Sequence, residues 1–366
     1  MHRRGSKRIL MMESGSFKVI GGAAKDTYGL YSKLSLRKDY SIDLYGNFSG
    51  IDKHAKTVTL EQLMSRDYDF VWMNSIRDVA IADAYRRRHP RSRARFLYVD
   101  RGNVLLNLRN AKLKRLLPKM VARRRLVSKL VGFLDYYVAI GLDQYNYARR
   151  FFKGRTSVKY ILIAPHEEFR VLGTSRNFNG ALAAGRLDER QKKINFMIRG
   201  IAKVIEEHPE LRDKELLRIV GSGVDEGRYR SLARSLRLGK NIRFKGFMVG
   251  EELVRAYNNA AFLVSTSEWE GLSRVLLEAM ACGLPLLIND RINTAIRDSP
   301  VTRIVREQYN GLVYRYGGLE DFAGEFYRLY SDRKLQKRLA SNARRFIKQF
   351  SFMRVVEDYE RIIDNA

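Results

Sequence analysis

The sequence predicts an α/β protein with two domains, each built on a parallel sheet that is covered by helices. The chain has 366 residues, of which 45% are apolar, and this is too long for a single small core. Short apolar runs of strand character alternate with stretches of helical periodicity, a pattern that favours parallel α/β domains. Several of these runs end in glycine-containing loops, the places where ligands of open α/β folds gather.

The first half of the chain begins with a strand at residues 7–12, followed by the glycine pair Gly21 and Gly22 and a helix at 27–36. Further strands are expected at 41–45, 70–74, 96–99, 135–140 and 158–163. Helices are expected between them at 76–88 and 144–152. This alternation indicates one complete domain.

The second half starts near residue 179 with a strand that ends at Gly185-Arg186, and a polar loop then leads into a long helix ending at Glu207. Strands at 216–220 and 242–245 and helices at 227–236 and 251–258 continue the alternation. The loop after the strand at 216–220 contains Gly221-Ser222-Gly223, which alone is a weak signal for phosphate binding.

The stretch from residue 266 to residue 289 carries the clearest chemical pattern. A buried strand at 262–266 precedes a helix that begins at Leu272 or Ser273, and Gly283 is expected as its left-handed cap before a strand at 284–288. The first amides of a helix have no partner within it, so those of Leu272, Ser273 and Arg274 are suited to a diphosphate.

Two carboxylates, Glu270 and Glu278, flank this helix start, and an ionised carboxylate accepts hydrogen bonds from sugar hydroxyls. A nucleotide sugar therefore fits, with hexose hydroxyls at Glu270 and ribose hydroxyls at Glu278. The structural alternative is that Glu270 caps the helix and Glu278 is a solvated residue on its exposed face.

This stretch resembles the Glu-x7-Glu signature of retaining glycosyltransferases with the GT-B architecture. The resemblance implies two doubly wound Rossmann-like domains that face an interdomain cleft, at residues 1–170 and 171–349, with a terminal helix at 350–366 crossing back to the first domain. It also implies transfer of a hexose from a nucleotide diphosphate sugar with retention of configuration, and no metal or other cofactor.

The resemblance further implies roles for individual residues. Arg186 and Lys192 would neutralise the donor diphosphate, Glu270 would orient the hexose as the catalytic carboxylate, and Glu278 would hold the ribose. The remaining donor-binding positions are Gly21, Gly22, Gly221, Phe247, Leu272, Ser273 and Arg274.

The first domain departs from the family at the edge of its sheet. Relatives place a histidine there to contact the hexose, and this chain has Asp100 followed by Arg101. Asp100 or Arg101 takes over that role in one interpretation, which makes Asp100 a candidate catalytic residue. In the other interpretation Asp100 only caps the following helix.

The charge is uneven, because residues 1–170 contain 35 Lys and Arg against 15 Asp and Glu within a chain of net charge +29. Residues 101–134 contain ten of these bases and no acid, with apolar residues at helical spacing, and six arginines lie in 86–95. Such a stretch suits an anionic membrane surface and a glycan or lipid-linked acceptor, although its apolar side is equally suited to the domain core.

Other classes have less support. The lone cysteine, Cys282, excludes a disulfide framework within the chain, and no apolar run is long enough to span a membrane, so a cytoplasmic protein is expected, with peripheral attachment to the inner membrane face as an option. Asp67-Tyr68-Asp69 has the Asp-x-Asp spacing of metal-dependent transferases, but it precedes a strand. A basic nucleic-acid-binding protein rests on charge alone, and a GT-B nucleotide-sugar epimerase or hydrolase stays open.

Overall fold

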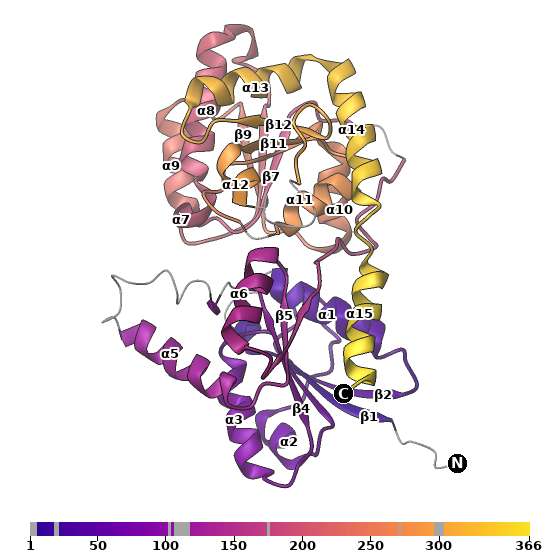
Figure 1. Cartoon of the computed structure of the whole chain (residues 1–366). Helices are drawn as coiled ribbons and strands as arrows, with labels where there is room; N and C mark the ends of the chain where they lie inside the picture. Colours follow the sequence, from indigo (N-terminus) through magenta and orange to yellow (C-terminus); the bar gives the residue numbers. More distant parts are fainter. Residues whose placement is uncertain are drawn as a thin grey trace. The chain divides into compact units, whose positions relative to one another are not determined.

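A computed structural model describes residues 6–17, 22–101, 104–105, 118–173, 176–270, 272–295 and 304–366. The chain forms two compact units (Figure 1). Unit 1 comprises residues 1–163 and 353–366, and unit 2 comprises residues 164–352. The chain thus leaves unit 1 after residue 163 and returns to it at residue 353, whereas the boundaries predicted from the sequence are 170 and 349.

Unit 1 has a six-stranded parallel sheet with the strand order β2-β1-β3-β4-β5-β6. Its strands are β1 (Lys7–Glu13), β2 (Tyr40–Gly46), β3 (Phe70–Met73), β4 (Arg95–Asp100), β5 (Tyr136–Ala139) and β6 (Ser157–Tyr160). The helices are α1 (Gly22–Leu34), α2 (Leu60–Ser65), α3 (Asp78–Arg88), α5 (Pro118–Val131), α6 (Leu142–Phe152) and α15 (Phe352–Asp364), with a 3₁₀ turn η1 (Ser14–Phe17). Residues 9–12 of β1 are fully buried, because helices cover both faces of the sheet.

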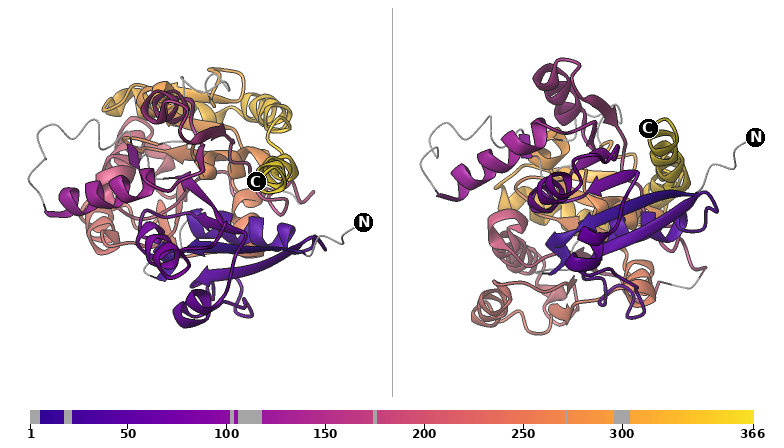
Figure 2. Two further views of the ribbon diagram at one scale, coloured as in Figure 1. Left: turned by 60° about the horizontal axis from the view of Figure 1, so that its bottom comes forward. Right: turned by 90° about the horizontal axis from the view of Figure 1, so that it is seen from below.

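The last helix, α15, completes unit 1 although it comes from the other end of the chain. It lies alongside the sheet in all views (Figures 1 and 2). The indole ring of Trp72 packs against Tyr359 with centroids 4.3 Å apart, and Lys7 Nζ donates to the Ile363 carbonyl at 2.5 Å. Residues 353–366 therefore form part of the core of unit 1.

Unit 2 repeats the architecture with the strand order β12-β11-β10-β7-β8-β9, again with all strands parallel. Its strands are β7 (Ala181–Ala184), β8 (Leu217–Val220), β9 (Ile242–Gly246), β10 (Phe262–Ser265), β11 (Leu286–Asn289) and β12 (Gly311–Tyr314). The helices are α7 (Glu189–Lys192), α8 (Ile194–Glu207), α9 (Glu226–Ser235), α10 (Gly250–Asn259), α11 (Arg274–Ala281), α12 (Asp290–Ala295), α13 (Leu319–Ser331) and α14 (Arg333–Ile347), with a 3₁₀ turn η2 (Pro209–Leu211).

The prediction of two doubly wound α/β domains is confirmed by these two parallel sheets. The main differences concern helix ends and short helices. Helix α1 begins at Gly22, five residues before the predicted start. Helices α2, α7 and α12 were not predicted, because four to six residues are too few to show a helical period.

Candidate functional site

The order of the strands in unit 2 places a switch point between β7 and β10. From β7 the chain proceeds to β8 and β9 on one side, whereas β10, β11 and β12 follow on the other side. Because the connections leave in opposite directions, a crevice opens at the carboxyl ends of these two strands, and ligands of such folds bind there. The loops that meet at this crevice are 185–188 after β7 and 266–270 after β10.

Glu270 and Lys192, two of the predicted site residues, meet at this switch point. Lys192 Nζ lies 2.6 Å from Glu270 Oε1, and the two side chains are 15% and 10% exposed. Ser267 Oγ donates to the same carboxylate oxygen at 2.8 Å. The pair therefore places a positive and a negative group side by side at the crevice.

Gln191 holds the two loops together. Its side-chain Nε2 donates to the Trp269 carbonyl at 3.2 Å, and its own carbonyl accepts from the Glu268 amide at 2.8 Å. Its Oε1 accepts from Arg186 Nη2 at 3.0 Å, so the exposed Arg186 is anchored to the same residue. Gln191 was not predicted as a site residue, because a hydrogen bond between two loops leaves no trace in the spacing of residues along the chain.

The short helix α7, which follows the loop after β7, is held by hydrogen bonds at both of its ends. Thr266 Oγ1 donates to the Lys192 carbonyl at 2.7 Å, and the Asp188 carboxylate caps α7 by accepting from the Arg190 amide at 3.0 Å. Lys192 is thus carried on a short helix whose two ends are both held. This limits the positions that its ammonium group can take.

Gly221 brings three strand ends together. Its φ is +138°, and a Cβ atom built there would lie 1.8 Å from the Gly185 carbonyl oxygen. Its amide donates to the Gly246 carbonyl at 2.7 Å, and the Gly185 amide donates to Val220 at 3.0 Å. Gly221 therefore allows close packing of the ends of β7, β8 and β9, and its predicted contact with the donor stays a prediction.

The helix α11 begins at Arg274 with Ser273 as its N-cap, one residue later than the later of the two predicted starts. Gly283 has φ +74°, which confirms the predicted left-handed cap. The Arg274 guanidinium is buried and donates to the Ala164 carbonyl at 3.1 Å, and burial lowers its pKa to about 10. The side chain of Arg274 therefore contributes to the packing of unit 2. Binding of the sugar donor's diphosphate by the backbone amides of Leu272, Ser273 and Arg274 stays a prediction.

Glu278 is 3% exposed, so the alternative that it is a solvated residue is wrong. It lies on the face of α11 that packs against α10, and its carboxylate accepts from the Tyr257 hydroxyl at 2.9 Å. Burial and the negative charge of Glu278 raise the pKa of Tyr257 well above its usual value. Its role in ribose binding stays a prediction.

Two large side chains at the carboxyl-end edge of the unit 2 sheet are exposed. Phe247 directly follows β9 and is 49% exposed, and Trp269 directly precedes Glu270 and is 54% exposed. Phe247 was predicted as a donor-binding residue, whereas Trp269 was not singled out. Exposed aromatic rings are able to stack on bases or on sugar rings.

Asp100 at the end of β4 is fully buried. Its carboxylate accepts from the Val104 amide at 2.8 Å and from the Tyr137 hydroxyl at 2.5 Å. These contacts correspond to the capping interpretation, so the catalytic role of Asp100 stays a prediction without further support. Arg101 forms a buried ion pair with Asp26.

The predicted glycine pair is only partly described. Gly21 lies outside the described residues, and Gly22 is the exposed first residue of α1. Contact of either glycine with a donor stays a prediction.

Of the basic stretch at 101–134, the structure describes residues 101, 104, 105 and 118–134. In α5 and the turn after it, Val127, Leu130 and Leu134 are at most 6% exposed and belong to the core of unit 1. Arg124 and Arg125 are exposed. The described apolar side chains of this segment therefore face the core and its basic side chains face solvent, so Val127, Leu130 and Leu134 are not available for insertion into lipid. Association with a membrane stays a prediction.

The described ranges contain neither a candidate metal site nor a candidate membrane span. No three His, Cys, Asp or Glu side chains within the described ranges are grouped as a metal site requires. Asp69 accepts from the Arg8 amide at 2.8 Å, and Asp67 lies 3.1 Å from His89. None of the described helices is both long and apolar enough to cross a membrane.

Comparison with known proteins places this site in context. Residues 166–346 match the family model described as glycosyl transferases group 1. A D-inositol 3-phosphate glycosyltransferase of Streptomyces bingchenggensis is 30% identical over 176 residues, which are 47% of this chain and 37% of that protein. The chain thus covers well under half the length of this relative.

Solved structures resemble the whole chain. Sucrose-phosphate synthase from Thermosynechococcus elongatus has a TM-score of 0.75 at 15% identity, with 98% of both chains covered. Anabaena HepE in complex with UDP-glucose has a TM-score of 0.73 at 14% identity, covering 98% of this chain and 100% of that one. At these identities the likeness concerns the fold, which is the two-domain α/β GT-B fold.

Proposed function

Because residues 166–346 match the family model of glycosyl transferases group 1, we propose that this chain transfers a hexosyl group from a nucleotide diphosphate sugar to an acceptor hydroxyl. The observation that carries the proposal is the ion pair of Lys192 and Glu270 at the switch point of unit 2. HepE, whose fold is similar, has been solved with UDP-glucose, which supports a nucleotide-sugar donor.

The pair suits the charges that develop in glycosyl transfer. When the bond between the anomeric carbon and the diphosphate breaks, positive charge develops on the sugar and negative charge on the leaving group. Lys192, with Arg186 and the amides of residues 272–274, would stabilise the departing diphosphate, and Glu270 would stabilise the cationic sugar. Fixed charges aimed at developing charge are usually the largest contribution to catalysis.

Retention of configuration is part of the proposal. The acceptor would attack from the face that the diphosphate leaves, so no covalent nucleophile is assigned. Lys192 and Arg186 supply the positive charge that a metal would otherwise provide, so a metal chelator should leave the rate unchanged. The anomeric configuration of the product, read by NMR, tests retention directly.

The proposed acceptor is a glycan or a lipid-linked sugar at an anionic membrane surface. Exposed bases cluster on the neighbouring helices α3 and α5 and the loop after α3: Arg86, Arg87, Arg88, Arg91, Arg93, Arg124, Arg125 and Lys129. Each base near an anionic bilayer adds about 1 kcal/mol to binding. Since the described apolar residues of α5 face the core, this attachment would be electrostatic.

The experiment is incubation of the full chain with UDP-, GDP- and ADP-sugars, with and without candidate acceptors. We expect one donor to be consumed with transfer of its sugar to an acceptor. Consumption of the donor without transfer would instead favour the hydrolase or epimerase. The relatives named above are named for sugar chemistry, so nucleic-acid binding is not favoured, and a filter-binding assay at physiological salt checks this.

Donor binding has a convenient optical signal. The chain has two tryptophans, of which Trp72 is fully buried in unit 1 and Trp269 is exposed next to Glu270. A ligand at the switch point should therefore change the emission of Trp269 alone. The variant Trp269→Phe should abolish the change while calorimetry still detects binding.

A further inference from the structure

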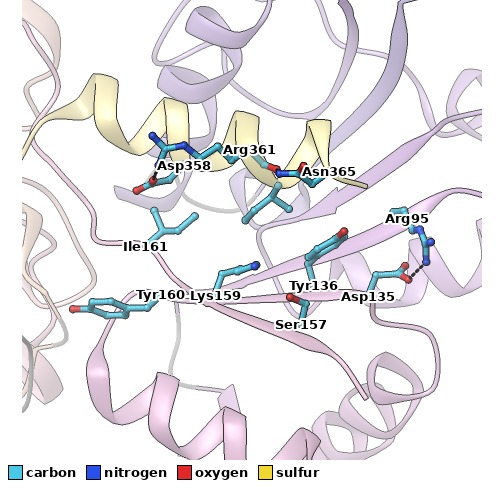
Figure 3. A pocket seen from close by; sticks show the side chains of 11 residues that line it. Arg95, Asp135, Tyr136, Ser157, Lys159, Tyr160, Ile161, Asp358, Arg361 and Asn365 are labelled. Atoms are coloured by element: carbon cyan, nitrogen blue, oxygen red, sulfur yellow. Dashed lines mark hydrogen bonds and ion pairs between the residues drawn. The ribbon is translucent and has the colours of Figure 1, made fainter. Parts of the chain in front are cut away.

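Unit 1 contains a pocket of about 630 Å³ (Figure 3). It lies between α15 and the strands β5 and β6, and the starts of β4, β5 and β6 close one end. Its volume is typical of pockets that bind small molecules. The residues at the switch point of unit 2 take no part in it, so it is a second candidate site.

Three hydrogen-bond donors of this pocket find no acceptor within the described part of the chain. The Lys159 ammonium and the hydroxyls of Tyr136 and Ser157 have no hydrogen-bond or ion-pair partner among the residues the structure describes. They lie on one face of the sheet, because Tyr136 pairs with Ser157 and Lys159 is two residues further along β6. With strands about 5 Å apart and alternate residues about 7 Å apart, one ligand group is able to reach all three.

The carboxylates of the pocket are already matched. Asp135 lies 2.8 Å from Arg95, and Asp358 lies 2.9 Å from Arg361. The charge of Lys159 is therefore the one left without a counterion among the charged side chains that line the described pocket. An anionic ligand would supply that counterion.

We propose that this pocket binds a small molecule carrying a phosphomonoester group, with the phosphate on Lys159, Tyr136 and Ser157. A phosphomonoester carries up to two negative charges and three strong acceptor oxygens, which match one ammonium group and two hydroxyl groups. Ile161 and Ile362 also line the pocket and offer apolar surface to the rest of the ligand. The pocket thus selects for an organic phosphate over inorganic phosphate.

The two walls of the pocket are the segments that connect unit 1 to unit 2. Ile161 lies two residues before the chain leaves unit 1, and α15 is the segment by which the chain returns. A bound ligand would hold α15 against β6. Ligand binding should therefore raise the temperature at which unit 1 unfolds.

Calorimetric titration of the full chain with glycerol 3-phosphate, glucose 6-phosphate and inorganic phosphate tests this proposal. The variants are Lys159→Gln and Tyr136→Phe. Lys38→Gln is the matched control, because it removes the same charge from an exposed site of unit 1 outside the pocket. Lys192→Gln reports binding at the switch point of unit 2.

We expect at least one organic phosphate to bind more tightly than inorganic phosphate. A charge-assisted contact is worth about 1.5–3 kcal/mol, so Lys159→Gln should weaken binding about 10- to 100-fold. Tyr136→Phe should weaken it less, and Lys38→Gln and Lys192→Gln should leave it unchanged. UDP binding by Lys159→Gln should also be unchanged, which separates this site from the proposed activity.

Several outcomes would overturn the proposal. One is that no phosphate binds at up to about 10 mM, ten times the dissociation constant of a weak millimolar site. Another is that binding is lost in Lys192→Gln but kept in Lys159→Gln. A third is that the wild type binds no ligand and Lys159→Gln self-associates. In that case the role of Lys159 would be to prevent the edge strand β6 from pairing with another chain.

Discussion

Glu270 and Glu278 lie eight residues apart, and the structure gives them different surroundings. Glu270 contacts Lys192 at the crevice, whereas Glu278 is buried against Tyr257. A glutamine keeps the shape of either side chain and removes its charge. The two substitutions should therefore have separable effects.

We expect Glu270→Gln to lower kcat about 100-fold, the loss typical of removing one group that stabilises developing charge. Nucleotide affinity should be nearly intact or slightly higher, because Lys192 loses its competing partner. Glu278→Gln should instead weaken nucleotide binding about 10-fold. Steady-state kinetics and calorimetry check both variants, and the same defects in both would contradict the division of roles.

Glu13 is a buried acid at the end of β1 whose ionisation should affect stability. Burial and the nearby charge of Asp78 raise the pKa of Glu13 to about 7, from an ordinary value of 4.5. The folded state thus binds the proton more tightly than the unfolded state. The stability that this contributes is complete below about pH 4.5 and is lost as the pH rises through about 7.

The expected consequence is a pH-dependent difference between wild type and Glu13→Gln. Relative to the variant, the free energy of unfolding of the wild type should fall by roughly 2 kcal/mol between pH 5 and pH 8. Denaturant titrations at both values measure it, with the exposed Glu61→Gln as the control. A constant difference across this range would show that Glu13 titrates normally.

At the scale of the elements, the ends of β7, β8 and β9 depend on Gly221. An alanine there would place its Cβ 1.8 Å from a backbone oxygen at φ +138°, so the strand ends must separate. We expect Gly221→Ala to cost at least about 2 kcal/mol. For a unit of this size each kcal/mol lowers Tm by about 2–4 °C, which scanning calorimetry resolves.

Gly227 in α9 offers a matched control, because nothing lies within 4 Å of its added Cβ. Gly227→Ala should be neutral or should stabilise the chain by up to about 1 kcal/mol, since alanine favours a helix. Equal destabilisation by the two substitutions would show that close packing at Gly221 is not the cause.

The helices and strands also show which parts of the fold and of the candidate site can be predicted from sequence patterns. The central strands of both sheets were predictable because each is a short apolar run between loops, the pattern that a fully buried parallel strand leaves. The edge strands β6 and β9 are only partly buried, and apolar and polar residues alternate in them. Lys192 and Glu270 are 78 residues apart in the sequence. They meet because the strand order places β7 next to β10, and the loops after these two strands lie side by side. The bracing by Gln191 and the burial of Glu278 depend on neighbouring elements, so spacing along the chain did not indicate them.

At the scale of the whole molecule, the uneven charge predicts how the chain meets a membrane. Arg124→Gln with Arg125→Gln should weaken binding to anionic vesicles about 10- to 30-fold, since each base contributes about 1 kcal/mol. Binding should also be released by high salt, because exposed charges are screened beyond about 8 Å already at physiological salt. Co-sedimentation with anionic and neutral vesicles measures this.

The control removes the same charge from an exposed helix of unit 2, by Arg228→Gln with Arg234→Gln in α9. It should leave vesicle binding nearly unchanged. Equal losses in the two double variants would mean that only net charge matters. Equal sedimentation with neutral vesicles would remove the membrane proposal.

The most direct test of the central claim is a calorimetric titration with UDP, GDP and ADP of the wild type, Lys192→Gln and Lys193→Gln. The two lysines are adjacent and each is paired with a glutamate, Lys192 with Glu270 at 2.6 Å and Lys193 with Glu268 at 2.8 Å. If the switch point of unit 2 binds the donor diphosphate, one nucleotide binds the wild type, and Lys192→Gln weakens it about 10- to 100-fold while Lys193→Gln changes it little. No binding of any nucleoside diphosphate, or equal weakening by both substitutions, would contradict the account.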